Sequence, residues 1–167
     1  MITEYTNKDF FDILHVINNA ALKYKGVIPD DCWHEPYMSE KELINEFDNG
    51  VRMFGYEKDS LLVGVMGIQD VQDVTLIRHA YTLGNYQGMG IGKALLQHLF
   101  KVNESSSLLV GTWEDATWAV RFYVNNGFAL HGRARADQLL NKYWQVPVKQ
   151  MQHSVVLEKQ LNPVSDL

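Results

Sequence analysis

The chain has 167 residues, of which 46% are hydrophobic and 21% charged, and this ordinary globular composition excludes a disordered or collagen-like chain. Fifteen basic and 20 acidic side chains give a net charge of −5, without a Lys/Arg run, so no nucleic-acid partner is expected. The longest uncharged apolar run covers residues 61–68, far short of the ~20 residues of a membrane helix, so no membrane association is expected. The length predicts a single domain over residues 1–167.

The beginning of the chain lacks the basic segment of a secretory signal, and the single cysteine, Cys32, has no partner for an internal disulfide. The expected compartment is therefore the cytoplasm. Cys32 and His34 are close in the sequence, but no paired Cys/His spacing completes a tetrahedral ligand set, so no metal site is predicted.

Two helices are predicted near the start of the chain. Thr6 provides a cap for the first, whose apolar residues recur at helical spacing as far as Tyr24. Ser39 and Glu42 form a capping box for the second, which ends at residues 49–50.

Three strands are predicted next. Residues 51–57 and 61–69 flank the turn at 58–60 and read as a hairpin, and residues 74–83 form a third run of strand type. This third strand leads into a glycine-rich segment at residues 84–90.

The rest of the chain alternates between the two kinds of element. Residues 91–102 carry one apolar helical stripe, 108–113 read as a buried strand, and 115–125 as a helix closed by a glycine. Two last strands, near 128–133 and 151–158, are separated by a loop or short helix. The order β-α-α-β-β-β-α-β-α-β-β predicts a mixed sheet covered by helices, α/β or α+β in class.

The glycine-rich turn is the most informative stretch. Gly88, Gly90 and Gly92 alternate at the start of the helix, where glycine lets the backbone approach a ligand and the free N–H groups favour an anion. The expected ligand is a phosphate or pyrophosphate, and the alternative is a turn that uses glycine only for its geometry.

Spacing excludes two familiar phosphate-binding motifs. A Walker A loop requires glycine and Ser/Thr where this chain has Gln87 and Ala94. A dinucleotide-binding fingerprint requires glycine at positions where this chain has Lys93 or Leu95.

The pattern Gln87-x-x-Gly90-x-Gly92 resembles the coenzyme A pyrophosphate loop of the GNAT (GCN-related) N-acetyltransferase superfamily. Residues 119–128 resemble the second signature of that family, A-x-x-F-Y-x-x-x-G-F. The resemblance implies a GNAT-like mixed, mostly antiparallel sheet of about seven strands, with splayed central strands and about four covering helices. Family members often carry Asn three residues before the second signature, where this chain has Ala116, which puts one hydrogen bond to the pantetheine arm in doubt.

The resemblance implies an acetyl-CoA-dependent N-acetyltransferase that transfers the acetyl group directly to the amine of a small molecule or a protein. The alternative is a non-catalytic sensor that binds CoA or acyl-CoA. Members are often dimers, and eight Tyr and four Trp leave aromatic side chains available for a homodimer interface. The implied cofactor-binding residues are Thr82, Leu83, Gln87, Gly88, Met89, Gly90, Ile91, Gly92, Lys93 and Phe122.

Tyr123 matches the general acid of the family, which protonates the departing thiolate; a core tyrosine is the alternative. An amine acceptor is protonated at neutral pH, so desolvation or a general base must favour its neutral form. Glu35, between the first two helices, is placed first as the base, with a solvated surface carboxylate as the alternative. Further candidates for the base are Asp31, His34, Arg78, His79, Glu114, Asp115 and His153.

Four aromatic residues are candidates for the wall of an acceptor pocket, although core packing explains them equally well. They are Trp33, Tyr37, Tyr143 and Trp144.

Overall fold

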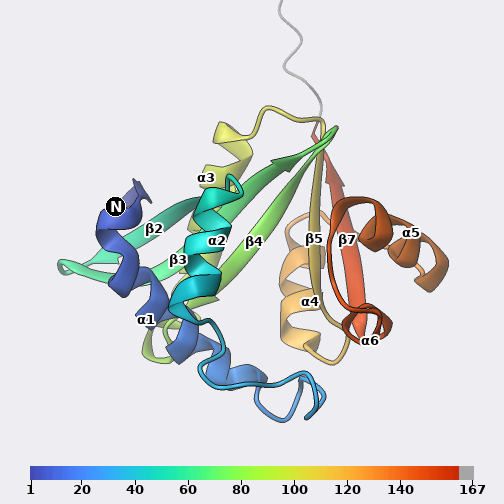
Figure 1. Cartoon of the computed structure of the whole chain (residues 1–167). Coiled ribbons are helices and arrows are strands. Elements are labelled where there is room, and N and C mark those ends of the chain that lie inside the picture. Colours follow the sequence, from blue (N-terminus) through green and yellow to red (C-terminus); the bar gives the residue numbers. More distant parts are fainter. Residues whose placement is uncertain (162–167) are drawn as a thin grey trace, which may run out of the picture.

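The computed structural model describes residues 1–161, which form a seven-stranded mixed sheet covered by helices (Figure 1). The strands lie in the order β1-β2-β3-β4-β5-β7-β6, and all neighbouring pairs are antiparallel except β4 and β5. The predicted fold class is confirmed. The strands are β1 (Ile2–Tyr5), β2 (Arg52–Lys58), β3 (Leu61–Val71), β4 (Val74–Thr82), β5 (Ser107–Trp113), β6 (Ala129–Leu130) and β7 (Ser154–Gln160). The helices are α1 (Phe10–Ala21), α2 (Glu40–Asp48), α3 (Ile91–Val102), α4 (Thr117–Asn125), α5 (Arg133–Tyr143) and α6 (Val148–Gln152).

The capping box predicted for the second helix is present at the start of α2. The Glu42 N–H donates to the Ser39 hydroxyl oxygen at 3.2 Å, and the Ser39 N–H donates to the Glu42 carboxylate at 2.9 Å. These bonds satisfy N–H groups that a helix leaves free at its first turn. They fix the start of α2, about two turns before Glu46, which is part of the candidate site.

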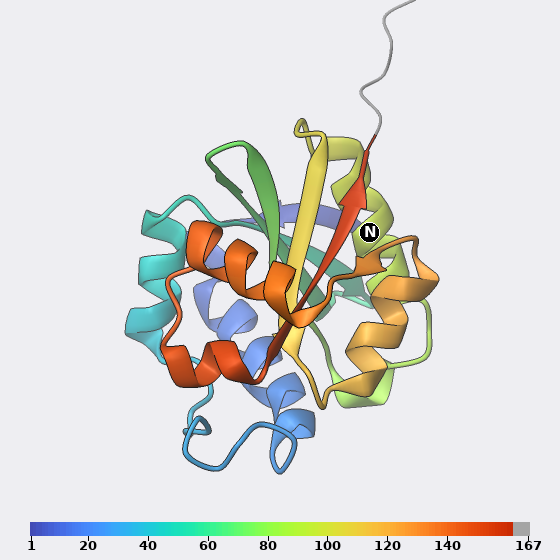
Figure 2. The same ribbon diagram turned by 90° about the vertical axis from the view of Figure 1, so that its right-hand side faces the viewer.

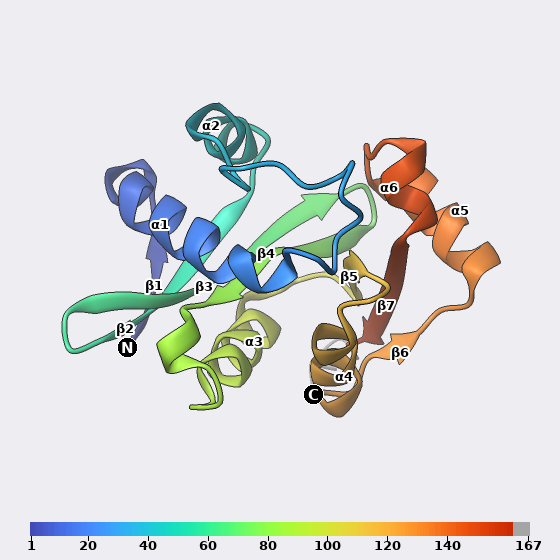
Figure 3. The same ribbon diagram turned by 90° about the horizontal axis from the view of Figure 1, so that it is seen from below.

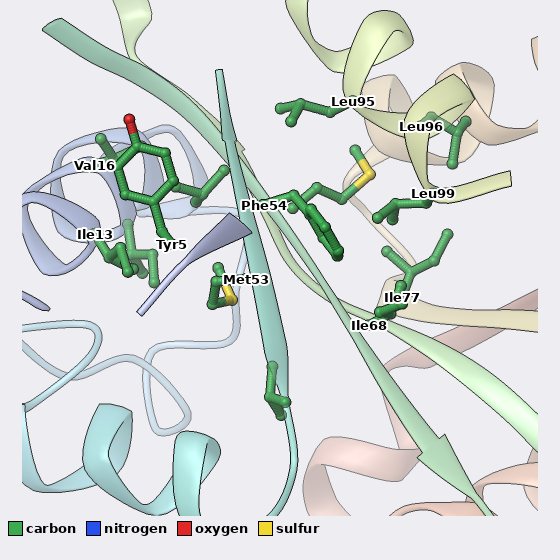
Figure 4. Packing of buried hydrophobic residues seen from close by; sticks show 14 of the residues in the cluster. Tyr5, Ile13, Val16, Met53, Phe54, Ile68, Ile77, Leu95, Leu96 and Leu99 are labelled. Atoms are coloured by element: carbon green, nitrogen blue, oxygen red, sulfur yellow. The ribbon is translucent and has the colours of Figure 1, made fainter. Parts of the chain in front are cut away.

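The core lies on both faces of the sheet. Met53 and Phe54 are adjacent in β2, and Figure 4 shows Met53 on the side of α1 and Phe54 on the side of α3. Leu99 of α3 is fully buried in the same cluster as both. Figure 3 shows α1 and α2 on one face of the sheet and α3 on the other.

The segment between β6 and β7 differs from the prediction. Where a longer strand and a loop or short helix were expected, β6 has only two residues and is followed by the 11-residue helix α5 and by α6, so that β7 begins at Ser154. The sequence of α5 is mostly polar, and its buried residues Ala136, Leu139 and Leu140 pack against Val156 of β7. Tertiary packing therefore stabilises a helix with a weak local signal. Figure 2 shows α5 crossing in front of β5 and β7.

The two central strands separate after a short contact. β4 and β5 pair in parallel only where Thr75–Ile77 meet Leu108–Val110, and the strands then diverge, as Figure 1 shows. This confirms the predicted splay. Among the described residues, no helix is long and apolar enough to span a bilayer.

Candidate active site

A cavity of about 700 Å³ opens where β4 and β5 separate. It is lined by β4, β5 and α4, by the turn before α3, by the end of the α1 segment, and by the segment that joins α5 to α6. Elements that are far apart in the sequence therefore meet at this opening.

The turn before α3 forms a backbone cradle at one side of the cavity. Gly88 and Gly90 have φ of 77° and 79°, in the left-handed region that glycine tolerates best. The first helical hydrogen bond of α3 runs from the Ala94 N–H to the Gly90 carbonyl, at 3.0 Å. The N–H groups of residues 91–93 precede it and have no acceptor within the helix, and no side chain caps them. The cradle therefore offers N–H donors to an anion.

Most residues that the sequence assigned to cofactor binding lie on the cavity. Leu83 does not: it is buried, and its N–H donates to the Val63 carbonyl at 2.9 Å, so the strand ladder already uses this donor. The Met89 side chain is 57% exposed and does not line the cavity either. The assigned residues that do line it are Thr82, Gln87, Gly88, Gly90, Ile91, Gly92, Lys93 and Phe122.

Lys23 is a cavity residue that the sequence reasoning missed. Its ammonium lies 4.7 Å from the centroid of the Trp118 ring and 3.4 Å from the side-chain oxygen of Gln87. It lies beside the cradle and adds a cation to that of Lys93. No local pattern marks it, because its partners are on α4 and on the turn before α3.

Tyr123 of α4 lines the cavity and is only 4% exposed. Its ring lies 5.0 Å from that of Phe122 and 5.3 Å from that of Phe128, between centroids. Burial, followed by the proximity of Tyr24, raises the pKa of Tyr123 well above its usual value. The hydroxyl therefore remains protonated at neutral pH and is a proton donor in the cavity.

A β-bulge in β4 presents His79 to the cavity. Val65 pairs with Tyr81 and Gly67 with Arg78, so two residues of β4 lie opposite one residue of β3. His79 is in the bulge and has a φ of 54°, a conformation that is strained for a non-glycine residue. Such strain is retained where the surrounding structure enforces it, often at functional sites.

Glu46 of α2 holds this histidine. The Glu46 carboxylate lies 2.6 Å from His79 Nε2 and 3.0 Å from the Arg78 guanidinium. Burial alone would raise the pKa of Glu46, but the hydrogen bond to His79 and the charges of His79 and Arg78 outweigh it, and the pKa is lowered. Arg78 also donates to the Gln69 side-chain oxygen at 2.9 Å.

The structure does not bring Glu35, the first choice for the base, to the cavity. Its side chain is 53% exposed and pairs with the Lys25 ammonium at 3.0 Å, which lowers the pKa of the carboxyl. His79, one of the other candidates, does line the cavity. Glu46 was not among the candidates, because its partner in the sequence is 33 residues away.

Aromatic side chains form part of the cavity wall. Tyr24 and Tyr37 each lie 6.1 Å from Tyr81 between ring centroids, and all three line the cavity together with Trp144. Two of the four predicted aromatic residues, Tyr37 and Trp144, therefore belong to the wall.

The other two are elsewhere. Trp33 stacks on Tyr37 at 5.6 Å between centroids without lining the cavity, and the Tyr143 hydroxyl donates to Asp73 at 2.7 Å, away from it. Within residues 1–161, no three His, Cys, Asp or Glu side chains converge as metal ligands.

The comparisons with known proteins agree with this geometry. A family model described as an acetyltransferase (GNAT) domain matches residues 17–141. The solved structures that resemble the chain include the PaiA N-acetyltransferase of Thermoplasma acidophilum in complex with coenzyme A (18% identity, TM-score 0.74, 96% of this chain and 98% of that one). They also include a GNAT acetyltransferase of Staphylococcus aureus (17% identity, TM-score 0.73, 97% of this chain and 99% of that one). A third is a ribosomal-protein-alanine N-acetyltransferase of Brucella melitensis (18% identity, TM-score 0.67, 96% of this chain and 99% of that one). The curated proteins yield no significant match.

The lowered pKa of Glu46 predicts a pH-dependent contribution to stability. Because the folded-state pKa lies below the ordinary value of 4.5, the carboxylate stabilises the fold above that pH, and the contribution is lost as the pH falls below it. Glu46→Gln cannot titrate. Its deficit in the free energy of unfolding should be largest near neutral pH and should shrink between about pH 5 and pH 3 in urea denaturation. Asp48→Asn, at an exposed position of the same helix, is the control. A Glu46→Gln deficit that is constant over this range would contradict the assignment.

Proposed function

Because the chain belongs to the GNAT acetyltransferase family, we propose that it is an N-acetyltransferase that takes acetyl-CoA as donor and the amine of a small molecule or a protein as acceptor. The observation that carries this proposal is the shared cavity. The backbone cradle, the protonated Tyr123 hydroxyl and the His79 imidazole all border it. The homodimer and the cytoplasmic location stay predictions.

The cradle fits the phosphates of coenzyme A. A Cβ built on Gly88 or Gly90 would meet nothing within 4 Å, so these glycines serve the backbone angle, and the space beside the turn is open. Lys23 and Lys93 add positive charge beside them. Ala116, where the family often has Asn, is a fully buried methyl group and provides no hydrogen bond.

The exposed edge of β4 fits the extended arm of the donor. Beyond Ile77, β4 has no described strand partner on its β5 side, so backbone donors and acceptors face the opening. Thr82 lies on this edge, and its carbonyl accepts from the Gln87 side chain at 3.2 Å, which joins the edge to the cradle. An arm that carries amides can pair with such an edge as an added strand.

The chain's own residues supply the proton transfers. Bound acetyl-CoA provides an activated acetyl thioester, and the acceptor amine must be neutral to attack it. His79 accepts a proton from the amine, and Glu46 orients the imidazole and stabilises its charged form. Tyr123 donates the proton that the leaving sulfur requires.

The first test concerns the cradle. Gly90→Val places a branched side chain at a φ of 79° and should abolish CoA binding. The parent should be stabilised by CoA by about 2.7 kcal/mol at 100 times Kd, measured as a rise in Tm, and the variant should not. Gly132→Val, at an open position with a φ of −68°, should behave as the parent. If Gly90→Val binds CoA normally, the cradle is assigned wrongly.

The second test concerns the acid. Tyr123→Phe keeps the ring and removes only the hydroxyl, so CoA affinity should change little while kcat falls by roughly 10²–10⁴. The loss should be smaller with acyl donors whose thiol leaves more easily. Tyr143→Phe is the matched control, because its hydroxyl bonds to Asp73 outside the cavity. Full activity in Tyr123→Phe would refute the acid role, and CoA binding without transfer to any amine would favour the sensor.

The third test uses the strained backbone at His79. His79→Gly should fold well, since glycine tolerates a φ of 54°. Its kcat/KM should be lower than that of the parent by roughly 10²–10⁴-fold. Imidazole added to the solution should restore part of the activity of this variant and should not accelerate the parent. If the variant is inactive and imidazole has no effect, His79 has only a structural role.

A further inference from the structure

The wall of the cavity that faces away from α3 is the part that is free to contact the acceptor. We define it as the acceptor wall, formed by Tyr24, Tyr37, Trp144, Val146 and Gln150. Tyr24 and Tyr37 come from the segment between α1 and α2, Trp144 and Val146 from the segment that joins α5 to α6, and Gln150 from α6. Both segments lie across the sheet from α3, whose first turn forms the cradle.

The aromatic surface of this wall is held in place by its neighbours. The Trp144 ring packs against β5 at Gly111, where a Cβ would be in ordinary van der Waals contact with the ring at 3.5 Å. Burial, then the neighbouring Tyr37, raises the pKa of Tyr24 to about 12, so its hydroxyl is neutral at physiological pH. The wall therefore presents fixed, uncharged aromatic groups.

Among the described residues, none that lines the cavity carries a carboxylate. Of the described residues that line it, the charged ones are Lys23, Arg78 and Lys93, together with the titratable His79, and none is Asp or Glu. The Glu46 carboxylate, which contacts the lining residues Arg78 and His79, is already paired with both of them. A second ammonium group of an acceptor would have no counter-charge here.

We propose that the acceptor is a monoamine carried on an aromatic or apolar body, and not a polyamine or a lysine-rich peptide. This inference rests on the proposed function. The reacting amine is placed near His79, the aromatic body contacts Tyr37 and Trp144, and each additional ammonium is disfavoured because no described lining residue offers a carboxylate to pair with it.

The test compares matched amines with the full chain and acetyl-CoA, by release of the CoA thiol. Hexylamine and 1,6-diaminohexane have the same chain length and differ by one ammonium group, and 2-phenylethylamine adds the ring. We expect kcat/KM for hexylamine to exceed that for the diamine by about tenfold or more, with 2-phenylethylamine the best of the three and spermidine the poorest of all the amines.

Two variants connect the preference with the wall. Gln150→Glu introduces a carboxylate of nearly the same shape. It should raise the ratio of kcat/KM for the diamine to kcat/KM for hexylamine by about tenfold. Trp144→Ala should reduce the advantage of 2-phenylethylamine over hexylamine by about tenfold, and Trp144→Phe should retain most of it.

The outcomes separate the two levels of the proposal. Transfer to spermidine, to 1,6-diaminohexane or to a lysine-rich peptide at least as fast as to hexylamine would overturn the acceptor class and leave the N-acetyltransferase function intact. If Gln150→Glu does not change the rate with 1,6-diaminohexane relative to hexylamine, this would also count against the proposed acceptor class. If CoA binds but no amine of the panel accepts an acetyl group, the proposed function fails, and the acceptor class fails with it.

Discussion

β4 and β5 pair over three residues only, and the other features of the site depend on the gap that opens beyond them. Backbone N–H and C=O groups inside a protein need partners, and within residues 1–161 no strand provides them on the β5 side of β4 beyond Ile77. The cradle borders the gap on one side and the aromatic acceptor wall on the other. A ligand with an extended amide arm can complete the sheet locally and reach both.

The distribution of charge separates the cavity from the rest of the molecule. The chain has a formal net charge of −5, yet its charged cavity residues, among those described, are basic. Salt screens charges beyond about 8 Å at physiological ionic strength, and Arg78 is paired with Glu46, so an anion in the cavity responds mainly to Lys23 and Lys93. The acidic surface therefore does not prevent binding of a polyphosphate.

The features that the sequence predicted are those with local causes. Alternating strands, capping boxes and the cradle glycines Gly88 and Gly90 depend on residues within one turn or hairpin. The contact between Glu46 and His79 joins α2 to β4 and has no local signature, so only the fold reveals it. Glu35 shows the opposite case, in which a sequence position is misleading. Its place between two helices suggested a pocket residue, but the ion pair with Lys25 holds its side chain outside the cavity. The sequence predicted only a loop or a short helix where α5 lies, because α5 is stabilised by packing on β7 and not by a strong local signal.

The bulge in β4 has a consequence for how such a site is inherited. β4 contains one residue more than its pairing with β3 requires opposite Met66, and this extra residue resets which side chains face which side of the sheet. Deleting one codon at this point would restore a regular ladder and turn the following side chains to the opposite faces. Which side chains of β4 face the opening beside β5 thus depends on the length of the strand as well as on its residue types. Deletion of Ala80 would therefore reorient side chains of β4 without changing any other residue that lines the cavity.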